Sequence, residues 1–251
     1  MYFDLDTAVL DAAQALCVAL PAAGAPAVLR GLRGGGWALV GPLAVVGTVV
    51  AITLASASAD VLTWIAFILV PIGSALAFGW AMHGARPWLA VLALVLLAIT
   101  LTGPDDPAGR VARLALIVTS CATVGRLLAG ATPLTLLKIG VVAMAVVDSV
   151  FIFGDFFGEQ NAIFNAAAPA EGLPRLQVAE IGHTATDYGD FFISGVVGAI
   201  LACERRPQLL AAALTFVAAE LWNQLFLVVD SLPNTVPPAV VLVGFELWSR
   251  R

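Results

Sequence analysis

Two aspartates lie inside strongly apolar stretches in the second half of the chain. Asp148 stands in AMAVVDSVFIF, and Asp190 stands in TDYGDFFISGVVGAILA. A carboxyl group at the centre of a membrane-spanning helix costs about 2.5–3.5 kcal/mol on insertion scales, so a functional role is the first interpretation of such a residue. Two acids on successive apolar segments predict a shared site, and a shared site for two carboxyls favours acid–base chemistry.

Two carboxyls within hydrogen-bond reach cannot both ionise easily, because they release their protons as a coupled pair. In an aspartic protease the ionised member takes a proton from water, while the protonated member binds the scissile carbonyl and later protonates the leaving amine. This chemistry requires no metal and no cofactor. The same pair can also act as a proton relay in a transporter, or simply as hydrogen-bonding groups between helices. The aspartates alone leave these alternatives open.

The composition indicates that these residues lie in a membrane. The chain has 251 residues, of which 61% are hydrophobic and 12% are charged, and its mean hydropathy is +0.98. An average soluble domain is about 45–50% apolar and about 25% charged. We therefore predict a single all-α, polytopic integral membrane domain. The net charge of −5 includes no basic patch that would suggest a nucleic-acid partner.

The remaining reactive residue types are scattered. Cys17, Cys121 and Cys203 lie far apart in apolar segments, which fits neither a metal site nor a disulfide framework, so we interpret them as small core residues. His83 and His183 fall near the ends of predicted spans, and we expect them at the membrane interface.

Apolar windows predict nine transmembrane helices. They cover about 7–28, 36–57, 60–81, 87–103, 110–130, 132–154, 186–203, 207–229 and 233–249. Residues 1–131 then form five scaffold helices, and residues 132–251 form the four helices of a catalytic core. A loop of about 155–185 joins the two aspartate helices. A loop of this length in a compact domain more often has a function than serves only as a connection.

Loop charges predict the orientation, because Lys and Arg gather in cytoplasmic loops. The basic loops are marked by Arg30 and Arg33, Arg86, Arg126 and Lys138, Arg205 and Arg206, and Arg250 and Arg251. The intervening loops are acidic or mixed: Asp4 and Asp6, Asp60, Asp105 and Asp106, Asp155 to Glu180, and Asp230. This alternation predicts an outside N-terminus and a cytoplasmic C-terminus. The short loops, and a start (MYFDLD) without a basic leader, suggest the cytoplasmic membrane of a prokaryote.

Four segments resemble motifs of the presenilin and signal peptide peptidase family of GxGD intramembrane aspartyl proteases. DSVFIF from Asp148 resembles the Tyr-Asp motif of span six, and DYGDFFI from Asp187 resembles the GxGD motif of span seven. GLPRLQ (172–177) resembles the short segment that precedes GxGD, and PAV (238–240) resembles the Pro-Ala-Leu motif of span nine. Order and spacing agree over about 132–251. The departures are Asp187 for the first glycine, Val147 for the tyrosine and Val240 for the leucine.

The resemblance implies hydrolysis of peptide bonds within transmembrane helices or signal-peptide remnants. Asp148 and Asp190 would be the catalytic acids, and Asp187 a third acid that modulates them. The substrate would add as a strand along about 173–180. The implied substrate-binding residues are Leu173, Pro174, Leu176, Tyr188, Gly189, Pro238, Ala239 and Val240. The predicted orientation resembles that of signal peptide peptidase, which favours substrates with a cytoplasmic N-terminus.

Other functions remain open at this stage. A proton-coupled transporter would use the same aspartates as a relay, and a presenilin-like homologue that has lost activity would bind helices without cleaving them. A prepilin-type peptidase is disfavoured, because the basic residue after Gly-Asp and the paired cysteines are missing. Glu220, Asn223 and Gln224 share a helix face, which we interpret as interhelical hydrogen bonding in preference to a water entrance.

Overall fold

The computed structural model describes residues 4–24, 31–154, 156, 158–229 and 231–249. Within these ranges the chain is mostly helical, as predicted. Five of the charged residues used for the orientation lie outside the described residues: Arg30, Asp155, Asp230, Arg250 and Arg251.

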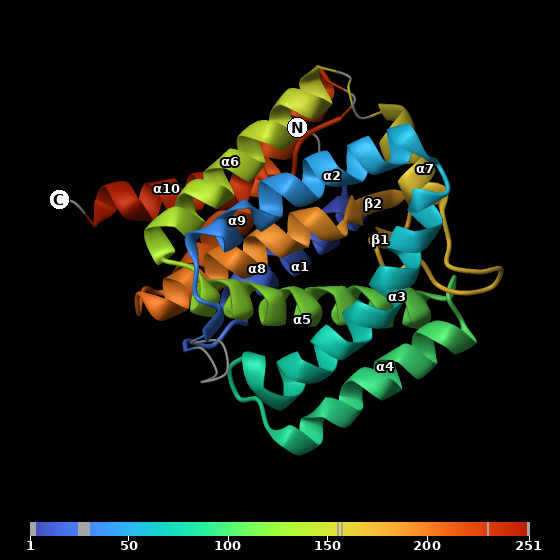
Figure 1. Cartoon of the computed structure of the whole chain (residues 1–251), viewed down its shortest axis with the longest axis horizontal. Helices are drawn as coiled ribbons and strands as arrows, with labels where there is room; N and C mark the ends of the chain where they lie inside the picture. The colour runs from blue at the N-terminus through green and yellow to red at the C-terminus, as the bar shows by residue number, and fades with distance from the viewer. Residues whose placement is uncertain (1–3, 25–30, 155, 157, 230, 250–251) are drawn as a thin grey trace.

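The elements follow one another in the order that Figure 1 shows. The helices are α1 (Leu5–Ala19), α2 (Val40–Leu54), α3 (Ser58–Leu76), α4 (Val91–Thr102), α5 (Pro107–Ala131), α6 (Leu134–Phe153), α7 (Gly158–Ala166), α8 (Tyr188–Cys203), α9 (Gln208–Trp222) and α10 (Val236–Trp248). The strands are β1 (Val178–Ile181) and β2 (Thr184–Asp187). Short 3-10 turns at Gly35–Leu39, Pro87–Ala90 and Asn223–Leu227, and a π-helical turn at Ala77–Ala81, extend α2, α4, α9 and α3.

Each of the nine predicted spans contains a helix. Five helical segments in the described ranges are long and apolar enough to cross a membrane: Gly35–Leu54, Ser58–Ala81, Pro107–Ala131, Leu134–Phe153 and Gln208–Leu227. Pro87–Thr102, Tyr188–Cys203 and Val236–Trp248 are apolar but shorter. This architecture fits an integral membrane protein, while the count of nine spans stays a prediction. The first helix is shorter than predicted, because it ends at Ala19, two residues before Pro21.

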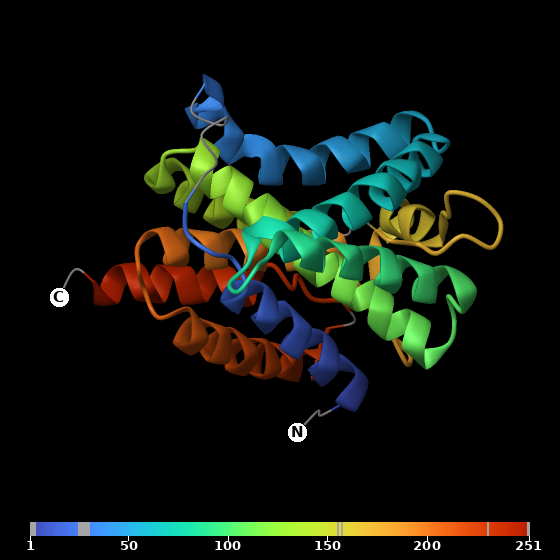
Figure 2. The same ribbon diagram turned by 90° about the horizontal axis from the view of Figure 1, so that it is seen from below.

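The central element of the bundle is α8, around which α1, α5, α6, α9 and α10 are packed. Almost every residue of α8 after its first turn is buried. In Figure 2 the helices α2, α3 and α4 lie on one side of this centre, and α1, α9 and α10 lie on the other. Helices from both predicted halves of the chain therefore enclose the segment that carries Asp190.

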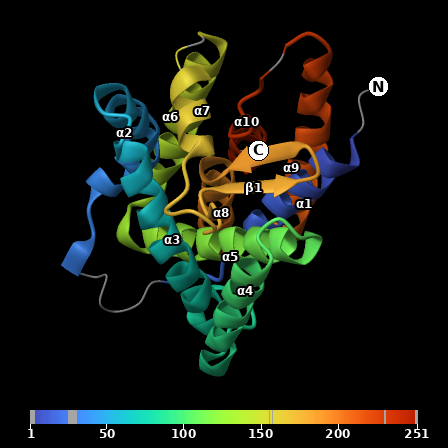
Figure 3. The same cartoon turned by 90° about the vertical axis from the view of Figure 1, so that its right-hand side faces the viewer.

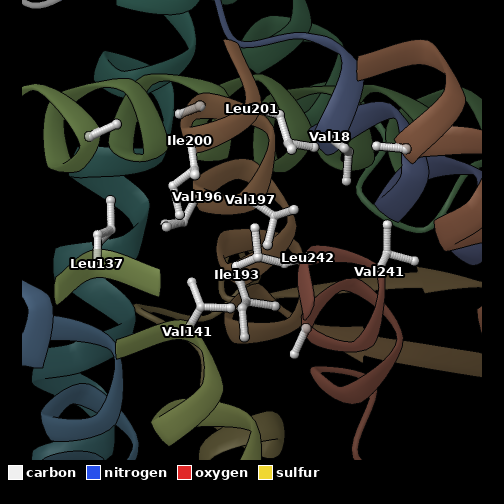
Figure 4. Packing of buried hydrophobic residues seen from close by; sticks show 14 of the residues in the cluster. Val18, Leu137, Val141, Ile193, Val196, Val197, Ile200, Leu201, Val241 and Leu242 are labelled. Carbon is white, nitrogen blue, oxygen red and sulfur yellow. The ribbon is translucent and has the colours of Figure 1, made fainter. Parts of the chain in front are cut away.

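Two apolar clusters hold α8 in place. Figure 4 shows the first cluster, in which Val141 of α6 and Leu242 of α10 meet Ile193 and Val197 of α8. The second cluster lies on the α5 side, where Phe191 of α8 packs with side chains of α1, α3, α5 and the hairpin. Close van der Waals packing on both faces of α8 supplies the attraction for this arrangement.

The predicted loop of 155–185 contains more structure than the sequence indicated. It forms α7 and an antiparallel hairpin in which Val178 pairs with Asp187 and Ile181 pairs with Thr184. The connecting turn is tight, and its Gly182 has a φ of +56°. Figure 3 faces the hairpin directly and shows it at one end of the bundle, whereas Figure 1 places the C-terminus at the opposite end.

Ion pairs fix the hairpin against the helices. Arg113 of α5 is 2% exposed and pairs with Glu180 of β1, with an Nη2–Oε2 distance of 3.1 Å. Arg175 pairs with the same carboxylate at 2.5 Å. At the turn, His183 Nδ1 lies 2.9 Å from Asp6 Oδ2, which joins the hairpin to the start of α1. The hairpin is therefore anchored to α5 and to α1.

Close backbone contact between α5 and α8 predicts a sensitive glycine. A Cβ atom on Gly195 would lie 2.4 Å from the carbonyl oxygen of Cys121, and one on Gly125 would lie 2.2 Å from that of Gly195. We expect Gly195→Ala to separate the helices and to destabilise the protein by about 1–3 kcal/mol, as overpacking does. Thermal unfolding in detergent measures the effect. The control is Gly47→Ala, because a Cβ there meets nothing within 4 Å; equal melting temperatures for the two variants would contradict the packing.

Candidate active site

Asp148 and Asp190 lie at the same end of the bundle, the end that carries the hairpin. Asp148 stands five residues before the end of α6, and Asp190 is the third residue of α8. The two helices run in opposite directions and pack against each other through Val141, Met144 and Ile193. Asp148 and Asp190 therefore lie near the same end of two neighbouring helices, while their depth in a membrane stays a prediction.

The two carboxyls are both half-buried, so each retains some accessible surface. Asp187, which ends β2, lies three residues before Asp190 and adds a third carboxyl to this end of the bundle.

Asp148 has a hydroxyl partner that the sequence did not predict. Thr235 Oγ1 donates to Asp148 Oδ2 at 2.6 Å. Thr235 is 2% exposed and immediately precedes α10. The segment before α10 therefore contacts the first aspartate directly.

Gln14 of α1 is the second contact that the sequence did not predict. Its Nε2 donates to the main-chain oxygens of Asn234, at 2.7 Å, and Asp190, at 3.2 Å. In the sequence, Gln14 and Asp11 weakened the apolar character of the first predicted span. In the structure both residues are buried, and Asp11 accepts a hydrogen bond at 2.7 Å from Asn223, which begins the 3-10 turn after α9.

Asp187 ends β2 and caps the N-terminus of α8. Its carboxyl is hydrogen-bonded by Asn165 and Asn161 of α7, and its main chain is hydrogen-bonded to the carboxyl of Asp190. Burial raises the pKa of Asp187 to about 6, and the nearby charge of Asp148 acts in the same direction. The residue that replaces the motif glycine is thus built into the site.

The other predicted substrate contacts differ in their placement. A Cβ atom on Gly189 would meet Met144 Cε at 3.7 Å, an ordinary van der Waals contact, so this glycine packs beside α6. Tyr188 packs in the second apolar cluster and bonds Ser120, with an oxygen–oxygen distance of 3.1 Å. Pro238 and Ala239 are buried, whereas Val240 is 58% exposed on the outside of the bundle.

The segment that precedes the hairpin is mostly internal. Leu176 is fully buried in the second cluster, Pro174 is buried and Leu173 is half-buried. The side chain of Gln177 is also internal and donates to the main-chain oxygen of Ala167 at 2.8 Å. Leu173 is therefore the most accessible of the three predicted contacts, and the binding of a substrate by this segment stays a prediction.

One potential metal-ligand group occurs among the described residues. Asp4, Asp6 and His183 bring three ligand atoms within 4.8 Å of one another. They lie at the hairpin turn and not beside Asp148, and they already pair with one another. The carboxyl site between α6 and α8 is thus separate from this group.

Comparisons of the chain with protein-family models, with curated proteins and with solved structures find no match. The sequence motifs and the geometry described above are therefore the basis for proposing a function.

Because the pKa of Asp187 is raised, we predict that the difference in stability between the native protein and an Asp187 variant changes with pH. The folded protein binds this proton more tightly than an ordinary carboxyl with a pKa of 3.8 does, so this residue makes stability fall as the pH rises from about 4 to about 6. Asp187→Asn should remove that contribution. We expect the melting temperature of the variant, relative to the native protein, to be higher at about pH 7 than at about pH 4. An identical difference at both pH values would contradict the assignment.

Proposed function

We propose that the chain is an intramembrane aspartyl protease of the presenilin and signal peptide peptidase kind. The observation that carries the proposal is the placement of Asp148 and Asp190 near the same end of neighbouring antiparallel helices. The motif resemblance over 132–251 agrees with it. Within this proposal the chain crosses the cytoplasmic membrane of a prokaryote nine times, with an outside N-terminus and a cytoplasmic C-terminus.

The proposed reaction uses one proton shared by two carboxyls. The ionised aspartate takes a proton from a water molecule, and the resulting hydroxide attacks the peptide carbonyl, while the protonated aspartate donates to the carbonyl oxygen. Collapse of the tetrahedral intermediate then transfers a proton to the leaving amine and restores the pair. An apolar environment strengthens the hydrogen bonds of the two aspartates to the water molecule and to the peptide carbonyl.

A substrate helix must unwind before it is cut, and its freed backbone groups need partners. The outer edge of β2 can provide them. Tyr188 N donates to Gln177 O at 2.9 Å, which fixes the alternation of the hairpin so that the main-chain groups of Ala185 point away from β1. Because Asp187 adjoins Asp190, a strand added along β2 would lead its backbone to the carboxyl pair.

The substrates in this proposal are single transmembrane helices or signal-peptide remnants with a cytoplasmic N-terminus. No nucleic acid, metal or cofactor takes part in the proposed reaction. The half-buried state of Asp148 and Asp190 supports access for a substrate and for water.

Substitution of either aspartate tests the proposed function. We expect purified native protein in liposomes to cleave a single-span reporter helix, and Asp148→Asn and Asp190→Asn to lose at least about 10³-fold of the rate. A transition-state inhibitor of aspartic proteases should block the native protein. Mass spectrometry of the products measures the cut.

Two results would contradict this function. Folded native protein that cleaves no helix in either orientation would favour a homologue that has lost activity. Proton-coupled uptake that both asparagine variants abolish, without cleavage, would favour a transporter.

The edge of β2 can be tested separately. Ala185 is exposed, and its N–H points away from β1, so Ala185→Pro removes one edge donor at a position where proline is tolerated. We expect this variant to raise KM for the reporter about tenfold, because one backbone hydrogen bond to the substrate is lost. Ala185→Val keeps the N–H and serves as the control. Equal KM values for both variants would exclude strand addition at this edge.

A further inference from the structure

The segment just before α10 joins the two aspartates by two buried contacts. Its Thr235 side chain donates to the Asp148 carboxyl at 2.6 Å. Its Asn234 carbonyl accepts from Gln14 at 2.7 Å, and the same amide nitrogen of Gln14 reaches the Asp190 carbonyl at 3.2 Å. A continuous path thus runs from Asp148 through Thr235, Asn234 and Gln14 to Asp190, and we call it the bracket.

The bracket is built from buried groups. Thr235 and Gln14 are each 2% exposed. A hydroxyl-to-carboxyl distance of 2.6 Å lies in the range of charge-assisted hydrogen bonds, which are about twice as strong as neutral ones. Loss of the Thr235 hydroxyl would remove a hydrogen bond from Asp148 Oδ2, and loss of the Gln14 amide would remove one from the Asn234 carbonyl, so both contacts are costly to break.

The hydrogen bonds of the bracket also fix the relative orientation of the two helices, which apolar packing alone does not. The helices α6 and α8 meet through aliphatic side chains such as Val141 and Ile193. Such contacts tolerate small displacements, whereas hydrogen bonds to a carboxyl oxygen and to a main-chain oxygen restrict distance and angle. Gln14 acts on the backbone of Asp190, while Thr235 acts on the side chain of Asp148.

We propose that Thr235 and Gln14 are positioning residues of the carboxyl pair, and that α1 thereby forms part of the active site. The inference rests on the proposed function. Thr235 holds one oxygen of Asp148 in a fixed orientation, and Gln14 sets the position of the first turn of α8 relative to it. Neither residue exchanges a proton with the substrate.

The Thr235 contact is tested with a matched pair of substitutions. Thr235→Val keeps the size of the side chain and removes the hydroxyl, whereas Thr235→Ser keeps the hydroxyl. We expect Thr235→Val to lower kcat for the reporter helix by about 10–100-fold and to change KM by less than about threefold, because a misplaced catalytic group costs rate and not substrate binding. Thr235→Ser should regain most of the native kcat.

The Gln14 contact is tested in the same assay. Gln14→Met is similar in length and lacks the amide, and Leu16→Ala on the same helix is the control, since Leu16 is 54% exposed. We expect kcat to fall for Gln14→Met and to stay within about twofold of native for Leu16→Ala. Melting temperatures report how much of each variant is folded, and rates are compared per folded molecule.

The outcomes separate this inference from the proposed function. If the native protein does not cleave, the proposed function fails and the inference fails with it. If the native protein cleaves and Thr235→Val and Gln14→Met have native kcat, only the inference is overturned. A loss in Thr235→Val that Thr235→Ser shares would also overturn it, because the effect would then not come from the hydroxyl.

Discussion

A carboxyl group removed from water needs a hydrogen-bonding or ionic partner, and this requirement organises the bundle. Two acids near the candidate site accept a hydrogen bond from a residue of another element: Asp148 from Thr235, and Asp11 from Asn223. Because the unpaired state of such a group is costly in an apolar interior, these pairings fix how α1, α6, α9 and α10 surround α8. The apolar clusters hold the helices together, and the polar pairs determine how the helices are positioned along and about their axes.

The same principle operates at the opposite end of the bundle. Lys138 of α6 pairs with Glu204, which follows α8, and with Glu246 of α10. Arg206 adds contacts to both carboxylates. The two helices that carry the aspartates are therefore tied by ionic groups at the end far from the hairpin and by the bracket at the near end. Rotation of either helix would break contacts at both ends.

Much of the helical framework could be predicted from the sequence, because apolar periodicity and length determine where helices form. The hairpin could not be predicted, since four-residue strands such as Val178–Ile181 carry little sequence signal and the hairpin is anchored by residues of α5 and α1 that are distant in the sequence. Gln14 and Thr235 could not be recognised either: each is an ordinary polar residue until its partner, far away in sequence, is known.

Proximity of residues 148 and 190 is the central claim, and cysteine cross-linking in membranes measures it most directly. Cys17, Cys121 and Cys203 would first be replaced by alanine, and cysteines would then be placed at Asp148 and Asp190. The account predicts that a short bifunctional thiol reagent joins the two positions. A control pair with cysteines at Val146, which is 56% exposed on the outer face of α6, and at Asp190 should stay unlinked. No cross-link in the 148–190 pair of a folded protein, or equal linkage in both pairs, would contradict the account.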